Sequence, residues 1–178
     1  MASIEVPNTL AGRKLMVCVP TYNGNINIES AFALPSFALE ARNLGIEVIL
    51  SHFSGCSIVS KARNALVANF LESGADYLLF IDADVIVDTP SILRLLALGQ
   101  GKDVAAGIAP RRGENMEFMF DFHSENGNLV IDSTGMIRVS RIGAAFMLIQ
   151  RHVIETLVAQ HPEWAYTNGN DNGRTEYA

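Results

Sequence analysis

Apolar runs of strand length alternate with helical patterns through the first 110 residues, and this alternation limits the possible folds most strongly. The expected strands cover residues 14–19, 46–53, 76–82 and 102–107, and the expected helices cover residues 28–44, 57–73 and 90–98. The run at 76–82 is almost wholly apolar, as in a strand that is covered on both faces. Strands that alternate with helices in this way form a mostly parallel sheet with helices on both faces. The sequence therefore predicts an α/β fold.

The pattern changes after Pro110. Three short alternating segments, an apolar strand and a helix are expected there, at residues 116–123, 128–132, 136–141, 143–150 and 151–160. The last segment, 161–178, has no periodicity. No linker-like stretch separates these parts, so we expect one domain over residues 1–178, with a smaller antiparallel β portion after residue 110.

Composition excludes several classes of protein. The chain has 178 residues, of which 49% are hydrophobic and 18% charged, which is enough for one full core and excludes disorder. A formal net charge of −6 without a basic stripe argues against binding to nucleic acid. We expect no membrane span, because acidic residues interrupt the longest apolar stretch, and no signal peptide at the N-terminus. Cys18 and Cys56 lie in or beside apolar runs, so we expect both to be buried and reduced. That usage predicts a cytoplasmic protein, or one in the host cytoplasm if the chain is viral.

The sharpest chemical feature is an acidic pair, Asp82 and Asp84, at the end of a strand of five apolar residues. In extended geometry, residues i and i+2 point to the same side, so both carboxylates converge at the carboxyl end of a central strand. Open α/β sheets bind ligands at that edge. Two close carboxylates repel each other, which makes a divalent cation their natural partner. The alternative is that both are solvated turn residues, one of them capping the next helix.

An acidic pair of this kind has two main chemical interpretations. It holds Mn²⁺ or Mg²⁺ on the diphosphate of a nucleotide-sugar, or it supplies the nucleophile and the acid/base of a phosphatase. The phosphatase motif belongs to the first strand of its core and needs a later Gly-Asp-x-x-x-Asp segment. Here two strand–helix units precede Asp82 and no such segment follows. The context favours the nucleotide-sugar interpretation.

Polar residues also gather at the start of the second expected helix. Ser57, Ser60, Lys61 and Asn64 are spaced i, i+3, i+4 and i+7, so they share one face, and Arg63 lies on its flank. A helix N-terminus attracts anions, and Arg or Lys adds charge-assisted contacts. The cluster is a candidate for binding a nucleotide and its diphosphate, with a solvated helix face as the alternative.

Five strings together resemble a known family. They are Val-Cys-Val-Pro-Thr-Tyr-Asn-Gly (17–24), Ser-Lys-Ala-Arg-Asn (60–64), Leu-Phe-Ile-Asp-Ala-Asp (79–84), Gly-Ile-Ala-Pro-Arg-Arg (107–112) and Ile-Gly-Ala-Ala-Phe-Met-Leu-Ile (142–149). In this order and spacing the chain resembles the nucleotide-diphospho-sugar glycosyltransferases of the GT-A fold, close to the family-2-like enzymes of viruses and bacteria. The resemblance extends from residue 14 to about residue 162.

The resemblance implies a mostly parallel Rossmann-like sheet in which residues 14–110 bind the nucleotide-sugar and residues 111–178 form the acceptor side. Asp82 and Asp84 would contact the donor and hold Mn²⁺ or Mg²⁺. The other implied donor-site residues are Pro20, Thr21, Asn23, Ser60, Arg63, Asn64, Gly143 and Ala144. Each group also has a plainer interpretation: a turn that closes a strand, a solvated helix face or a tightly packed strand start.

The resemblance also implies the reaction. A hydroxyl of a saccharide, glycan or protein-linked acceptor attacks the sugar's anomeric carbon, and family-2 enzymes invert its configuration. We expect Asp84 to be catalytic through the metal, and Asp121 to face the acceptor cleft as a second catalytic residue. Related enzymes usually continue with a Glu-Asp-x-x-Phe segment and a late histidine, whereas this sequence ends at Ala178. We therefore expect an incomplete acceptor side, with the missing roles supplied by Asp121, Asp171, Glu176 or a partner.

Three alternatives stay open at this point. Arg111 and Arg112 follow a strand end, where they would meet a phosphate or an acceptor group, or form surface charge. The domain as a whole could bind a nucleotide-sugar without catalysis. The same acidic pair could also serve a phosphatase or a nucleotidyltransferase.

Overall fold

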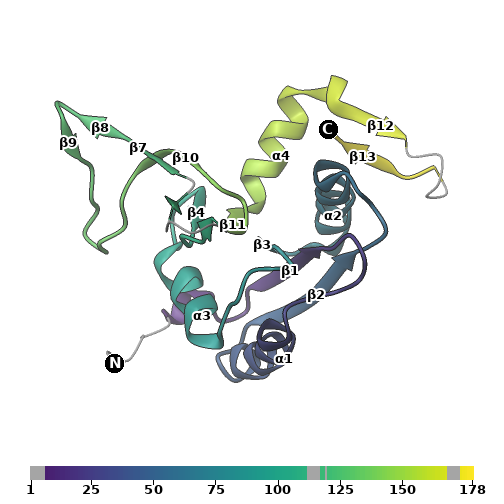
Figure 1. The fold of residues 1–178 in the computed structure, drawn as a ribbon, viewed down its shortest axis with the longest axis horizontal. Coiled ribbons are helices and arrows are strands. Elements are labelled where there is room, and N and C mark those ends of the chain that lie inside the picture. The colour runs from purple at the N-terminus through teal and green to yellow at the C-terminus, as the bar shows by residue number, and fades with distance from the viewer. Residues whose placement is uncertain (1–6, 112–116, 119, 168–172) are drawn as a thin grey trace.

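The computed structural model describes residues 7–111, 117–118, 120–167 and 173–178 (Figure 1). Its centre is a five-stranded mixed sheet of order β2-β1-β3-β11-β4. The strands are β1 (Lys14–Pro20), β2 (Glu47–Phe53), β3 (Tyr77–Ile81), β4 (Val104–Ala106) and β11 (Phe146–Gln150). The expectation of an α/β fold whose sheet is flanked by helices is confirmed, but the sheet is mixed, and its parallel pairs are β1–β2 and β1–β3.

Strand β11 makes the sheet mixed. It pairs antiparallel with both neighbours, β3 and β4, so β4 runs in the same direction as β1 to β3. Because β11 lies near the end of the chain and sits between two earlier strands, residues from both sides of position 110 build the central sheet. The sequence pattern predicted this strand from residue 143, but Gly143–Ala145 form a turn that leads into it.

Two helices cover each face of the sheet, α1 (Ile28–Asn43) and α3 (Thr89–Leu98) on one side and α2 (Val59–Ser73) and α4 (Arg151–Gln160) on the other (Figure 1). Alternate residues of β1 serve the two layers. The α1–α3 side includes Leu15, Val17, Phe37, Leu79, Ile92 and Leu96, and the α2–α4 side includes Met16, Cys18, Leu66, Phe70, Leu78 and Ile154. Burial on both faces explains why β1 and β3 are nearly continuous apolar runs.

Helix α1 begins where Asn27 caps it. The Asn27 side chain accepts hydrogen bonds from the backbone N–H groups of Glu29 and Ser30. Pro35 lies inside this helix, which runs without interruption from Ile28 to Asn43. Gly45, just beyond the C-terminal end, has φ 77°, a conformation that favours glycine.

The two cysteines differ in their surroundings. Both are free, but Cys18 is buried in β1 while Cys56 is only partly buried, so the expectation that both are buried is wrong for Cys56. Burial raises the pKa of the Cys18 thiol to about 12.

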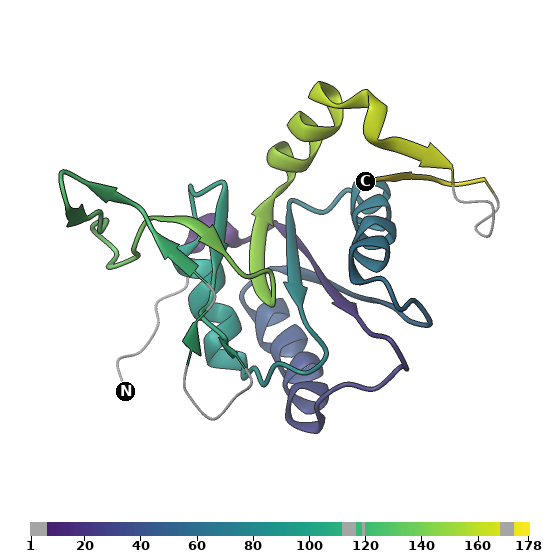
Figure 2. The same cartoon turned by 45° about the horizontal axis from the view of Figure 1, so that its top comes forward.

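A β arm, residues 120–142, leaves the sheet edge and projects from the body of the molecule (Figures 1 and 2). The antiparallel elements after residue 109 are β5 (Pro110–Arg111), β6 (Glu117–Phe118), β7 (Phe120–Phe122), β8 (Ser124–Glu125), β9 (Asn128–Leu129) and β10 (Val139–Ile142). They are shorter than the predicted strands. No residue of the arm is fully buried, so the arm has no core of its own.

The described parts of the C-terminal segment, residues 161–167 and 173–178, contain regular elements despite the segment's lack of periodicity. A short 3₁₀ helix η2 (Pro162–Trp164) leads into β12 (Ala165–Thr167), which pairs antiparallel with β13 (Thr175–Tyr177). This hairpin packs against α2, where Arg174 forms an ion pair with Glu72 at 2.6 Å. Strands of three residues are too short to show a period of two, which is why the pattern missed them.

None of the helices in the described part of the chain is long and apolar enough to span a bilayer. This agrees with the expectation from the sequence.

Candidate functional site

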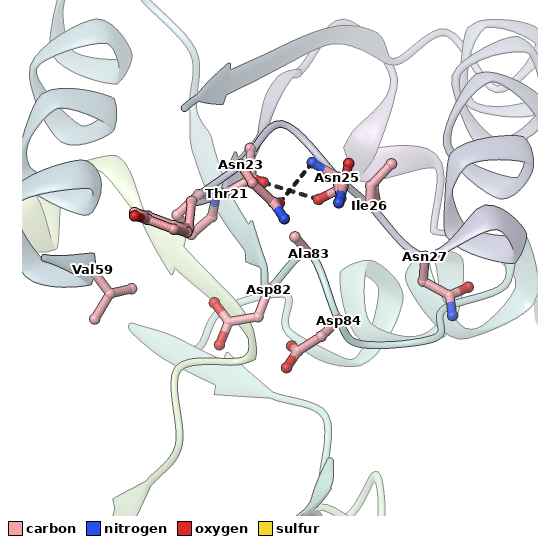
Figure 3. Close-up of a pocket in the computed structure, with 11 residues that line it drawn as sticks. Thr21, Asn23, Asn25, Ile26, Asn27, Val59, Asp82, Ala83 and Asp84 are labelled. Atoms are coloured by element: carbon pink, nitrogen blue, oxygen red, sulfur yellow. Dashed lines mark hydrogen bonds between the residues drawn. The ribbon is translucent and has the colours of Figure 1, made fainter. Parts of the chain in front are cut away.

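A pocket of about 490 Å³ opens at the carboxyl ends of β1 and β3 (Figure 3). Three segments contribute to it: the loop after β1, the first residue of α2 and the turn after β3. The lining residues are Pro20, Thr21, Tyr22, Asn23, Asn25, Ile26, Asn27, Val59, Asp82, Ala83 and Asp84. The pocket therefore lies at the edge where open α/β sheets place ligands, and it contains both acidic residues.

The loop after β1 is held by its own polar groups. The Thr21 hydroxyl donates to the Asn25 carbonyl oxygen at 2.9 Å, and the Asn25 N–H donates to Asn23 Oδ1 at 3.1 Å. Gly24, at the tip, has φ 79°. The Thr21 N–H donates to the carbonyl of Phe53, which ties the loop to the end of β2. Pro20, Thr21 and Asn23 thus line the pocket, on a loop held by these hydrogen bonds, and their contact with a nucleoside stays a prediction.

The acidic pair lies in a tight turn rather than on an extended strand. The Asp82 N–H donates to the Ala145 carbonyl at 2.8 Å, and the Val85 N–H returns to the Asp82 carbonyl at 3.0 Å. Both carboxylates point to the same side, into the open pocket (Figure 3). The expected convergence is present, but its cause differs from the expected extended geometry, because the chain turns at Ala83 and Asp84.

Arg63 joins this pair from α2. Its Nη2 lies 2.6 Å from Asp82 Oδ1, and its guanidinium lies 5.8 Å from the centre of the Phe80 ring. Its Nε is buried without a hydrogen-bond partner among the described residues. Arg63 does not line the pocket itself. It neutralises one of the two carboxylates and fixes the position of Asp82.

The remaining residues predicted on α2 point elsewhere. The helix begins at Val59, with Ile58 in an extended conformation before it, so Ser57 lies outside the helix and the expected four-residue face is not formed. Ser60 is exposed in the first turn and does not line the pocket. The Asn64 side chain donates to the Tyr166 hydroxyl at 3.5 Å, toward the C-terminal hairpin.

The described site residues predicted beyond position 110 do not line the pocket. Gly143 and Ala144 belong to the turn whose next residue, Ala145, accepts the hydrogen bond from Asp82, although neither lines the pocket. Asp121 lies on β7 in the β arm, paired with Arg141 at 2.7 Å, and does not line the pocket either. Arg111 lies in β5, while Arg112 and Asp171 lie outside the described residues.

The C-terminal hairpin contains a buried acid, Glu176, which is one of the residues expected from the sequence to supply the missing acceptor-side roles. Glu176 is fully buried, and the Tyr166 hydroxyl donates to its Oε2 at 2.6 Å. Burial and this hydrogen bond raise the pKa of Tyr166. This bond joins β12 to β13 within the hairpin, and Glu176 does not line the pocket.

The donor set of the pocket fits a hard divalent cation. Mg²⁺ and Mn²⁺ prefer oxygen ligands, and Mg²⁺ is commonly held by one or two carboxylates together with substrate phosphates. Asp84 and the second oxygen of Asp82 provide such ligands. The described residues contain no cluster of three or more His, Cys, Asp or Glu that could hold a metal by itself. The site thus fits a cation that arrives with a phosphate ligand rather than one held by protein alone.

Ser30 is the important residue that the sequence reasoning missed. It is fully buried, its hydroxyl donates to the Val85 carbonyl at 2.7 Å, and it accepts from the Val87 N–H at 3.0 Å. The Asn27 N–H adds a bond to the Ala83 carbonyl at 2.8 Å. The start of α1 thereby holds the loop that carries Asp84. A serine on the buried face of a helix was the only signal, and it does not reveal its partner.

Two comparisons with known proteins did not assign this chain to a family. A scan against models of protein families found no match to this chain, and a search of the curated proteins found none either. The likeness to glycosyltransferases therefore stays a prediction from the sequence.

Proposed function

We propose that this protein is a metal-assisted glycosyltransferase that moves a sugar from a nucleoside-diphosphate donor to an acceptor hydroxyl. The observation that carries the proposal is the Asp82–Asp84 pair, with Arg63 bonded to Asp82, in a pocket at the carboxyl edge of the sheet. Nucleotide binding at this edge is common among open α/β sheets. A GT-A fold, a cytoplasmic location and a saccharide, glycan or protein-linked acceptor remain parts of the same proposal.

The residues would divide the work as follows. The loop of Thr21 and Asn23 contacts the nucleoside, and Asp84 with Asp82 holds the cation, while Arg63 keeps Asp82 in place. Bound Mn²⁺ or Mg²⁺ supplies charge neutralisation for the diphosphate leaving group. The acceptor oxygen forms a bond to the anomeric carbon as the bond from that carbon to the phosphate oxygen breaks, which inverts the configuration.

A specific observation favours a second candidate, a nucleotide-sugar-binding domain without catalysis. Asp82 and Asp84 are the only acidic residues among those that line the pocket, so the described residues supply no separate base for the acceptor proton. The proton would then need an acceptor from outside this set. Asp121 is not a suitable one where it stands, since it is paired with Arg141 on the β arm.

A thermal-shift panel tests the donor site. UDP-, GDP-, ADP-, CMP- and dTDP-linked sugars are each titrated with and without Mn²⁺. In the presence of Mn²⁺, the right donor at about 100 times its Kd should raise the Tm by about 5–10 °C. Asp84→Asn should abolish most of the Mn²⁺-dependent shift. Asp103→Asn is the matched control, because this exposed carboxylate bonds His152 away from the pocket and should leave the shift intact.

The outcomes separate the candidates. No shift with any donor, or a shift that survives Asp84→Asn, contradicts the proposal. Binding without sugar release, even to water, favours the non-catalytic domain. Phosphate release from p-nitrophenyl phosphate without any effect of nucleotide-sugars would favour the phosphatase interpretation.

A further inference from the structure

We infer that two copies of this protein form a symmetric dimer, in which their β2 strands pair antiparallel and join the two sheets. The inference does not depend on the proposed function. It starts from the position of β2, which stands at one end of the strand order and pairs only with β1 among the described strands (Figure 1). A strand in that position keeps one side of its backbone available for hydrogen bonds with a further strand.

The hydrogen bonds at the two ends of β2 show which of its backbone groups are available. The Glu47 N–H donates to the Arg13 carbonyl. The Phe53 carbonyl accepts from the Thr21 N–H, so both ends of β2 bond toward β1. In a parallel ladder the bonding residues alternate along the strand. The outward backbone groups therefore belong to the alternate residues between these ends, Val48, Leu50 and His52. Within the described part of the chain, no hydrogen bond reaches them.

The free edge of β2 lacks the features that usually prevent an edge strand from pairing. Such edges are protected by short length, by Pro or Lys, or by a bulge. β2 has seven residues, contains neither Pro nor Lys, and keeps an unbroken register with β1. The strand at the other end of the sheet, β4, has only three residues. The long, unprotected edge of β2 therefore fits another strand.

Helix α1 adds an apolar flank on the same side of the molecule. The Ala33 carbonyl accepts from the Thr89 hydroxyl, which marks the flank of α1 that faces α3. At about 100° per residue, the opposite flank carries Ile28, Ala31, Pro35, Ala38, Leu39 and Arg42. Ile28 is 64% exposed and Leu39 is 67% exposed. Because α1 packs against β2 and α3 packs against β4, this flank lies on the side of the free β2 edge (Figures 1 and 2).

Charge favours a second copy as the source of the partner strand. The chain has a formal net charge of −6, so two copies can approach closely only where acidic side chains are absent or neutralised. Glu29 and Glu40, the two acids of α1, lie on the opposite side of the helix from the apolar flank. Glu47, at the start of β2, forms an ion pair with Lys14 at 2.9 Å.

The sequence of β2 also suits pairing with itself. An antiparallel register centred on Leu50 places this residue opposite its own copy, and Val48 opposite His52 of the second copy. This register uses the backbone groups of all three outward residues and opposes no like charges. Leu50, which is 47% exposed, would lie at the centre of the contact. An interface that pairs one surface with itself closes at two copies.

The oligomeric state tests the inference. Gel filtration with light scattering, at about 100 μM protein, should give twice the mass of one chain. Leu50→Pro removes the central outward N–H without removing a bond to β1, and Leu50→Lys places two positive charges opposite each other. Both variants should have the mass of one chain and an unchanged circular dichroism spectrum. Leu157→Lys on α4, where the native side chain is 40% exposed, is the matched control and should stay dimeric.

A cross-link tests the register of the strands. Cys18 is buried, so Cys56→Ser provides a background without an accessible thiol. In that background Leu50→Cys should form a disulfide between two copies, because directly opposite residues of antiparallel strands have Cα atoms about 5.5 Å apart. Leu157→Cys should stay uncross-linked on a non-reducing gel. A single-chain mass for the wild type, a dimer that survives both substitutions of Leu50, or no cross-link at position 50 overturns the inference.

Discussion

The two edges of the central sheet are built in opposite ways. At the amino edge, Asp76 accepts from the Lys14 N–H at 2.8 Å and from Arg13 Nη1 at 3.0 Å, and Arg151 bonds the end of α2. At the carboxyl edge, a pocket is lined by two carboxylates, those of Asp82 and Asp84. The polar groups of the amino edge bond within the fold, whereas the two carboxylates of the carboxyl edge line a pocket, where Asp82 also bonds Arg63.

This difference separates stability from binding within one sheet. Residues whose hydrogen bonds are made inside the protein contribute to the free energy of unfolding. Groups held ready for a ligand contribute little to it and often reduce it. Substitutions at the amino edge should therefore lower the free energy of unfolding without changing ligand affinity. Substitutions of the pocket residues at the carboxyl edge should lower ligand affinity with little change in the free energy of unfolding.

Arg151→Ala should have the largest effect on stability. Its Nε donates to the Ala75 carbonyl at 2.5 Å, its Nη2 donates to the Phe70 carbonyl at 2.8 Å, and its guanidinium lies 4.6 Å from the Phe70 ring. Losing charge-assisted bonds to carbonyls at the end of α2 should lower the free energy of unfolding by about 2–4 kcal/mol. Urea denaturation measures this loss.

The comparison supplies the control for this variant. Arg138→Ala removes an exposed arginine of the β arm, 3.6 Å from Glu125, and should cost less than about 1 kcal/mol. Nucleotide affinity should be unchanged in both variants. A large change of affinity in Arg151→Ala would mean that the amino edge is coupled to the pocket, contrary to the separation.

Ser30→Ala tests a buried side chain whose hydrogen bonds support the carboxyl edge. The variant leaves the Val85 carbonyl and the Val87 N–H without their shared partner, which should cost about 1–3 kcal/mol in the free energy of unfolding. Because these bonds hold the loop that carries Asp84, Mn²⁺-dependent nucleotide binding should weaken too. Calorimetry on folded protein measures that affinity.

Ser36→Ala is the matched control on the same helix. Its hydroxyl is exposed and bonds only the Phe32 carbonyl within α1, so both stability and affinity should stay within error. If Ser30→Ala lowers stability while affinity is retained, the serine supports the core alone and does not position Asp84.

The sequence predicted what depends on long local patterns. Helices of ten or more residues and strands of five to seven were found because their periods repeat several times, and the position of Asp82 at a strand end followed from the apolar run before it. The proximity of Arg63 to the acidic pair was also expected.

Other features depend on contacts between distant segments, which local patterns do not contain. The antiparallel direction of β11 is set by its insertion between β3 and β4. The partners of Ser30 lie 55 and 57 residues away in the chain. Helix α2 begins at Val59 and not at Ser57 as expected, because Ile58 before it has an extended backbone conformation. Site residues placed by strand ends were therefore predicted better than those placed by side-chain contacts.

Asp88 gives the smallest effect and sharpens the comparison, because it stabilises the fold from the carboxyl edge. It caps α3, where its Oδ1 accepts from the Ser91 N–H at 2.8 Å, and the contacts with Ser91 lower the pKa of Asp88 below its usual range. Asp88→Ala should lose about 1 kcal/mol in the free energy of unfolding at pH 7.

A lowered pKa in the folded state means that the ionised cap stabilises the protein above the unfolded pKa of about 4, and that this contribution disappears as the pH falls through the folded value. The difference between wild type and Asp88→Ala should therefore shrink as the pH is lowered from 7 toward 3. Asp88→Asn, which caps without a charge, should keep most of the stability and show no such pH dependence, as urea denaturation at several pH values can measure. A difference that stays constant with pH would mean that the Asp88 charge contributes nothing to the cap, and a difference of zero at every pH would mean that this cap does not stabilise the fold.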